Sequence, residues 1–130
     1  MPTQYSIDVD SHIVRTAYSG IVTAREISDY STRLYVDPVF RSYFSEIVTF
    51  EGNTDIRLSY LDWQSLARLD PFSSTSKHAF VVDSRTALRG AIRMYQSARD
   101  NTDNIRIFET VDQALAWLSA IAPLARAEGR

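Results

Sequence analysis

The chain has 130 residues, a length at which one domain buries well over half of the surface that its unfolded form exposes. Its hydrophobic fraction of 45% and charged fraction of 23% are ordinary for a globular protein, and its formal net charge of -2 excludes the overall basic character typical of nucleic-acid binding. The absence of cysteine excludes disulfides, thiolate metal sites and cysteine nucleophiles.

The first ten residues, MPTQYSIDVD, contain no basic region followed by an apolar run. Nowhere does the sequence contain the roughly 18 successive apolar residues that a membrane-spanning helix needs. We therefore expect a cytoplasmic protein with no transmembrane segment and no nucleic-acid partner.

The N-terminal part of the sequence predicts a β-hairpin. Apolar and polar residues alternate over Tyr5–Asp10, as they do in a half-buried strand, and Ile13–Tyr18 is a second β-rich run. The connection between the two runs is very short, so the two strands are expected to pair antiparallel.

A helix and a third strand are predicted next. Thr23 and Glu26 have the spacing of a capping box, which predicts a helix that starts there and continues to about Tyr35. The Asp37–Pro38 pair ends it, because the residue before proline is pushed out of the helical region. The run Glu46–Phe50 then reads as a strand.

The second half of the chain alternates helices and strands. A short helix is predicted over Ser59–Leu69, a strand over His78–Val82 and the longest helix over about Arg85–Arg99. The stretch Asn104–Leu118 shows a strand period and then a helical period, with Thr110 and Gln113 placed as a capping box between them.

This order, ββαβαβαβα, predicts an α/β fold. Strands that are separated by helices lie parallel with right-handed crossovers, so we expect a mostly parallel five-stranded sheet with helical cover and an antiparallel first strand. The predicted domain covers residues 1–122, and residues 123–130 form a C-terminal tail.

The same order, with the segments Gly20–Ile27, Arg106–Thr110 and Ala114–Leu118, resembles the SpoIIAA-like group of STAS domains and their Sec14-type relatives. The resemblance covers nearly the whole chain. It implies a non-enzymatic binding or regulatory module with an unknown protein partner. The alternative that it implies is a Sec14-like carrier of a lipid or small apolar ligand.

Classical members of that group carry a phosphorylatable serine in an Asp-Ser-Ser/Thr-Gly-like segment after the third strand. The corresponding segment here, Phe50–Ile56, lacks that motif. Thr54 is its nearest hydroxyl and is therefore the candidate phosphate acceptor.

Three arginines are spaced along one face of the predicted third helix. Arg85, Arg89 and Arg93 recur every four residues, which aligns their guanidinium groups. Such a row suits an acidic partner, a phosphate or a lipid headgroup, although a solvated helix face with local carboxylate partners is the alternative.

Four predicted strands carry one aromatic residue each near their ends. If the strands are in register, these residues line one face of the sheet, where they form either an apolar ligand site or ordinary core. The four are Tyr18, Phe50, Phe80 and Phe108.

The predicted third helix also has a face of small residues that includes Gly90 and Ala91. A glycine inside a helix costs about 1 kcal/mol relative to alanine, so we expect another element to approach its backbone closely. The sheet or a neighbouring helix is one candidate, and a second subunit of a homodimer is the other.

No catalytic motif is recognisable. The sequence has no glycine-rich phosphate loop, no His-Glu-x-x-His motif and no nucleophile elbow, so we predict no catalytic residue, cofactor or metal site. A weaker enzyme hypothesis places a site at strand ends near Asp83, Ser84 and Thr110.

Overall fold

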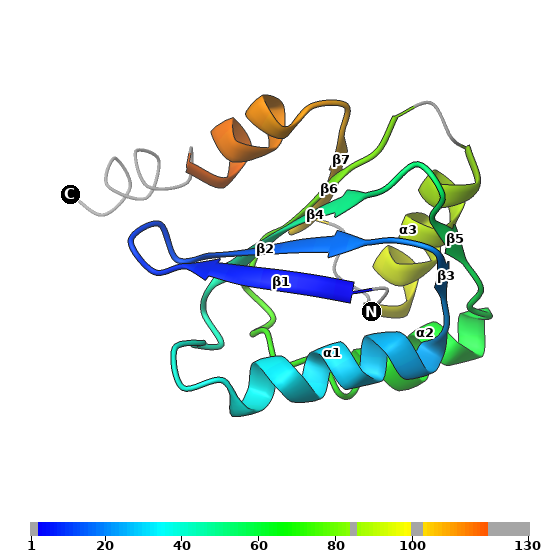
Figure 1. The fold of residues 1–130 in the computed structure, drawn as a ribbon, viewed down its shortest axis with the longest axis horizontal. Helices are drawn as coiled ribbons and strands as arrows, with labels where there is room; N and C mark the ends of the chain where they lie inside the picture. Colours follow the sequence, from blue (N-terminus) through cyan, green and yellow to red (C-terminus); the bar gives the residue numbers. More distant parts are fainter. Residues whose placement is uncertain (1–2, 84–85, 100–102, 120–130) are drawn as a thin grey trace.

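The computed structural model describes residues 3–83, 86–99 and 103–119, which form a five-stranded sheet with helices on both faces (Figure 1). The strand order is β1-β2-β4-β6-β7; β1 pairs antiparallel with β2, and every other pair is parallel. The predicted fold class is confirmed. The five strands are β1 Thr3–Asp8, β2 Ile13–Tyr18, β4 Ser45–Phe50, β6 His78–Val81 and β7 Ile105–Phe108.

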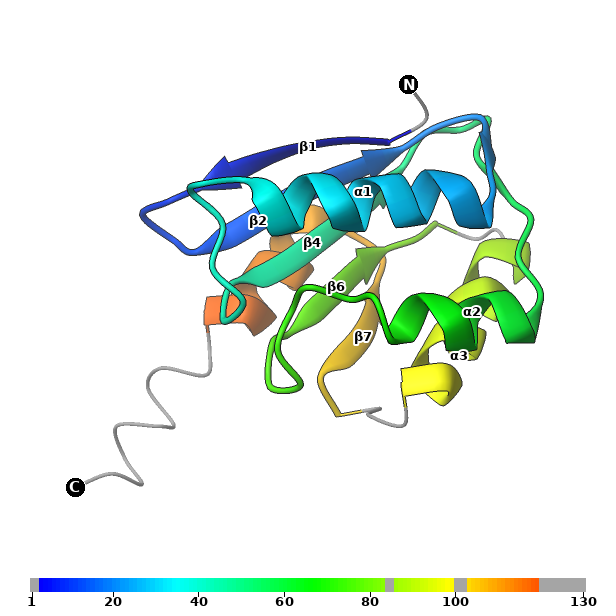
Figure 2. The same cartoon turned by 90° about the horizontal axis from the view of Figure 1, so that it is seen from below.

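The helices form two unequal layers. Three of them, α1 Ala24–Val36, α2 Tyr60–Ala67 and α3 Thr86–Arg99, cover one face of the sheet, and Figure 2 shows α1 and α2 side by side in front of it. A helix over residues 111–119 covers the opposite face. We call the two sides the inner face and the outer face, respectively.

Strand alternation assigns the side chains to these faces. In β2, Val14 and Tyr18 pack under the three helices, whereas Ile13 packs against the helix of residues 111–119. In β4, Val48 lies on the inner face and Ile47 on the outer face. The central strands therefore hold apolar residues on both sides, which is typical of parallel strands with helices on both faces.

Two very short strands form a second sheet that sequence periodicity did not reveal. β3 Ile21–Val22 and β5 Asp55–Ile56 pair in parallel beyond the ends of β2 and β4. Gly20, just before β3, has a φ of +65°, a left-handed conformation that glycine adopts at little cost.

The helix starts agree only partly with the predicted caps. Thr23 is the N-cap of α1, but its side chain makes no capping hydrogen bond, so the predicted box with Glu26 is wrong. A complete capping box occurs instead in α2, where the Ser59 hydroxyl accepts from the Asp62 amide and the Asp62 carboxylate accepts from the Ser59 amide. Of the predicted box of Thr110 and Gln113, one half forms: the Thr110 hydroxyl accepts from the backbone amide of Gln113, whereas the Gln113 side chain accepts from the amide of Glu109.

Candidate functional site

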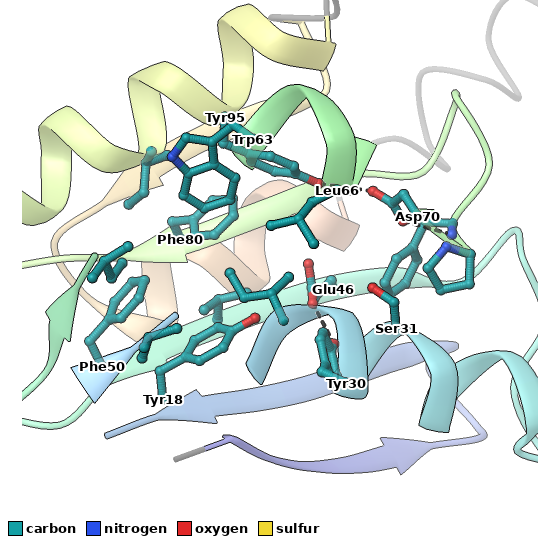
Figure 3. Close-up of a pocket in the computed structure, with 17 residues that line it drawn as sticks. Tyr18, Tyr30, Ser31, Glu46, Phe50, Trp63, Leu66, Asp70, Phe80 and Tyr95 are labelled. Carbon is teal, nitrogen blue, oxygen red and sulfur yellow. Dashed lines mark hydrogen bonds between the residues drawn. The ribbon is translucent and has the colours of Figure 1, made fainter. Parts of the chain in front are cut away.

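A cavity lies between the inner face of the sheet and the three helices that cover it (Figure 3). It offers about 60 Å³ to the centres of water-sized molecules. The strands contribute Tyr18, Val48, Phe50 and Phe80, and the helices contribute Tyr30 and Ser31 from α1, Trp63 and Leu66 from α2, and Ile92 and Tyr95 from α3. Its wall is thus mostly aromatic and aliphatic.

Three of the four predicted aromatic residues form one row along this wall. Tyr18 and Phe50 are register partners on β2 and β4, and their rings stack with centroids 5.8 Å apart. Phe50 in turn stacks on Phe80 of β6 at 6.4 Å. Tyr95 meets the Phe80 ring edge to face at 5.7 Å, so α3 closes this side of the cavity.

Phe108 does not belong to this row, and the expectation that all four aromatics share a face is wrong. Phe108 pairs in register with Val81, and both residues pack on the outer face. Its ring lies 5.6 Å from that of Trp117. The inner-face positions of β7 are taken by Ile105 and Ile107, which pair in register with His78 and Phe80 of β6.

The polar centre of the cavity is the carboxylate of Glu46, which is only 5% exposed. Its Oε2 accepts a hydrogen bond from the Tyr30 hydroxyl at 2.5 Å, and its Oε1 lies 2.8 Å from Nδ1 of His78. The Thr16 hydroxyl lies 2.6 Å from the Tyr30 oxygen and 3.4 Å from Oε2. A chain of hydrogen bonds therefore links β2, α1, β4 and β6 through one buried carboxylate.

His78 is the most deeply buried member of this network, at 1% exposure. Its ring is packed edge to face against Phe72 at 4.9 Å and against Tyr95 at 5.9 Å. Nε2 of His78 is buried and has no hydrogen-bond partner within the described parts of the chain.

The protonation behaviour of the tyrosines reflects the same environment. Burial raises the pKa of Tyr18, Tyr30 and Tyr95 well above the usual tyrosine value, and the charge of Glu46 raises it further. In Figure 3 the hydroxyl of Tyr18 points into the cavity toward Glu46. At neutral pH these hydroxyls keep their protons and can serve as hydrogen-bond donors.

A second carboxylate, Asp70, lies at the edge of the cavity and is paired with Arg99 and with the hydroxyl of Tyr95. Arg99 of α3 donates to Oδ2 of Asp70, and the Tyr95 hydroxyl donates to the same oxygen at 3.1 Å. Desolvation by burial lowers the pKa of Arg99, and the charge of Glu46 opposes this effect. Because Arg99 is paired with Asp70, Glu46 is the carboxylate of the cavity wall that has no Arg or Lys partner among the described residues.

This geometry suits a molecule with an apolar body and one polar group. A concave, largely apolar site with a few convergent polar atoms is the usual form of a small-molecule site. No protein-family model, curated protein or solved structure matches this chain. The arrangement of the cavity residues is thus the basis for any functional conclusion.

The candidate phosphate acceptor Thr54 lies outside the cavity and is buried. Its hydroxyl donates to the carbonyl oxygen of Glu51 at 2.7 Å and lies 3.0 Å from that of Tyr18. These contacts hold the turn between β4 and β5. A kinase would reach this hydroxyl only after the turn opened.

The arginine row is only partly visible. Arg85 lies outside the described residues, Arg89 of α3 is half-buried and Arg93 is exposed. Neither Arg89 nor Arg93 lines the cavity. The row and the cavity are therefore separate candidate surfaces.

The weaker enzyme hypothesis gains no cleft from the structure. Ser84 lies outside the described residues, Asp83 and Thr110 are exposed, and the Thr110 hydroxyl is engaged as a helix cap. Within residues 3–83, 86–99 and 103–119, no group of three His, Asp or Glu side chains is placed to hold a metal ion. None of the described helices is long and apolar enough to cross a membrane.

Sequence reasoning missed Glu46, Tyr30 and His78 as site residues. A signal for two of them was present, because Glu46 alternates with Val48 and Phe50, and His78 alternates with Phe80, so each shares the face of apolar neighbours. A charged or titratable residue at such a position indicates a buried polar site. Tyr30 carried no such signal, since a tyrosine on the apolar stripe of a helix is ordinary core.

Proposed function

We propose that this protein binds a small, largely apolar molecule in the cavity between its sheet and helices α1, α2 and α3. The observation that carries the proposal is the combination of aromatic walls with the buried carboxylate of Glu46. Burying a carboxylate is costly, and in a purely structural core an apolar residue of similar size is often at least as stable. A ligand-binding role explains both the space and the polar group.

The proposal follows the carrier function that the resemblance to Sec14-type relatives implies. Of the two predicted kinds of ligand, a lipid or a small apolar molecule, it takes the small molecule. A bound water needs about 10–15 Å³ of space for its centre, so 60 Å³ corresponds to roughly four to six water-sized groups. That is the size of a short-chain organic molecule rather than of a whole lipid.

The first test is direct binding of butan-1-ol, which has five non-hydrogen atoms. The variant Trp117→Phe leaves Trp63 as the only tryptophan, and Trp63 lines the cavity. We expect a saturable change in Trp63 fluorescence with a dissociation constant between about 1 mM and about 3 µM, since small ligands gain at most about 1.5 kcal/mol per non-hydrogen atom.

Two neighbouring residues of α1 give a matched pair of variants. Ser31 is buried and lines the cavity, whereas Thr32 is exposed. Ser31→Leu fills the space and is expected to weaken butan-1-ol binding at least about tenfold, equal to about 1.4 kcal/mol, while Thr32→Leu leaves it unchanged. Equal binding by both variants would show that the alcohol binds elsewhere.

A native mass spectrum beside a denaturing one tests the proposal without a chosen probe. A mass that is present only in the native spectrum would identify a retained ligand. If the protein carries no ligand and butan-1-ol gives no saturable signal, small-molecule binding is wrong. The search then returns to a protein partner, with the exposed Arg93 as the first residue to replace by glutamate.

A further inference from the structure

The charge of the cavity wall specifies the ligand further, an inference that rests on the proposed function. Glu46 and Asp70 are the acidic residues of the wall, and no Lys or Arg occurs among the described residues that line it. Asp70 is neutralised by Arg99. Glu46 has no such Arg or Lys partner among the described residues.

The hydrogen bonds of Glu46 involve both of its carboxylate oxygens. Tyr30 donates to Oε2, and Nδ1 of His78 lies at 2.8 Å from Oε1, so both oxygens are placed as acceptors. The single Tyr30 proton is directed to Glu46, and the Thr16 hydroxyl, at 2.6 Å, then donates to the Tyr30 oxygen. Since an ionised carboxylate accepts about four hydrogen bonds, Glu46 retains capacity for a further donor.

His78 is the other group in contact with this carboxylate. Its Nδ1 lies 2.8 Å from Oε1, and its Nε2 is buried between Phe72 and Tyr95 with no hydrogen-bond partner among the described residues. His78 therefore contacts only one oxygen of Glu46, through one ring nitrogen.

A buried carboxylate that has no Arg or Lys partner among the described residues is suited to contact with a bound cation. Ammonium groups form charge-assisted hydrogen bonds with carboxylates, and aromatic side chains attract organic cations through their ring faces. Glu46 with the aromatic residues around it offers both kinds of contact (Figure 3). We infer that the cavity selects a small organic ammonium ion whose alkyl part lies against the aromatic wall and whose nitrogen contacts the Glu46 carboxylate.

The test compares three head groups on one four-carbon chain: butylammonium, butan-1-ol and butanoate. Each is titrated into the Trp117→Phe protein at constant ionic strength, with Trp63 fluorescence as the signal. We expect butylammonium to bind about tenfold more tightly than butan-1-ol, the ratio that follows from a charge-assisted rather than a neutral hydrogen bond. Butanoate should bind most weakly, because its charge repels that of Glu46.

The variant Glu46→Gln identifies the group that selects the cation. It keeps the size of the side chain, and we expect it to reduce butylammonium affinity to that of butan-1-ol while butan-1-ol binding persists. Asp29→Asn, at an exposed acidic residue of α1 that does not line the cavity, is the control and should preserve the preference for the amine. A preference that survives Glu46→Gln but disappears in Asp70→Asn would assign the cation to Asp70 and overturn the inference.

The outcomes separate this inference from the function on which it rests. If butan-1-ol binds as well as butylammonium, or butanoate binds best, the cavity binds small molecules but does not select a cation. If none of the three gives a saturable signal, the proposed function fails as well. The three ligands are compared in the Trp117→Phe protein, which retains Glu46. This comparison therefore tests the inference even if Glu46→Gln does not fold.

Discussion

Tyr30 shows how one side chain serves both stability and the proposed site. Its ring packs in the core with those of Tyr5 and Tyr18, and its hydroxyl is the shortest contact of the buried Glu46. A hydrogen bond to a charged group contributes about 1.5–3 kcal/mol, more than a neutral one. Tyr30 thus offsets part of the cost of burying Glu46.

The buried tyrosines make a specific prediction about alkaline pH. The pKa values of Tyr18, Tyr30 and Tyr95 in the folded state lie above the unfolded value of about 10. As the pH rises past about 10, the unfolded chain loses these protons first, so the free energy of unfolding falls. The contribution of these protonated tyrosines to the free energy of unfolding is fully present below about pH 10 and decreases progressively above it.

The measurement is a series of urea unfolding curves between about pH 8 and about pH 11, with tyrosinate absorbance recorded in parallel. In urea all seven tyrosines are available to titrate. The native protein should form fewer tyrosinates at the same pH. Coincident native and denatured titration curves would contradict the burial of these hydroxyls.

At the scale of single elements, α3 has a sequence feature, a glycine inside a helix, for which the described residues provide no structural cause. The glycine at position 90 predicted close approach by another element, but a Cβ atom built at Gly90 has nothing within 4 Å. For the described part of this chain that prediction is wrong. A second subunit over this face remains the untested alternative.

Gly90→Ala distinguishes these cases. If the site is solvent-exposed, alanine should raise the free energy of unfolding by about 0.5–1 kcal/mol, because it removes the entropy cost of glycine in a helix. Gly20→Ala is the contrasting variant and should destabilise by about 1–2 kcal/mol, since Gly20 has a φ of +65°. Urea unfolding and analytical ultracentrifugation check both; destabilisation of Gly90→Ala with loss of a dimer would place a second subunit on α3.

At the scale of the whole molecule, the fold was more accessible from sequence than the site. Alternation in the strands and helical spacing between them predicted the α/β order, because side chains that are buried on one face recur in the sequence with the period of the strand or helix. The two-residue strands β3 and β5 are too short to show such a period. For Phe108 the sequence pattern was ambiguous, since alternation shows that Phe108 and Ile107 lie on opposite faces of the sheet but not which of them faces the three helices.

The Glu46 network was less accessible still, because it depends on which strands are neighbours. Glu46 and His78 are 32 positions apart in sequence, and only the pairing of β4 with β6 brings them together. Thr16 and Tyr30 join from β2 and α1. A single sequence shows that each residue is unusual at its position but not that the four form one site.

The two helical layers should unfold together, because β2, β4 and β6 supply residues to both. Trp63 reports on the inner layer and Trp117 on the outer one. In Trp117→Phe and in Trp63→Phe, the remaining tryptophan's urea transition should coincide with the circular dichroism transition of the same variant. An earlier fluorescence transition in either variant would show that the corresponding layer separates from the sheet first.

The pairing of Glu46 with His78 also has a consequence for the fidelity of folding. The two residues are directly opposed in the β4–β6 ladder. A slip of one residue in β4 would turn Glu46 toward the apolar outer layer and bring Ile47 opposite His78. Glu46 and His78 therefore help to specify the register of β4 against β6: staggered pairings of two apolar strands bury similar surface, but only the native register gives the carboxylate its partners.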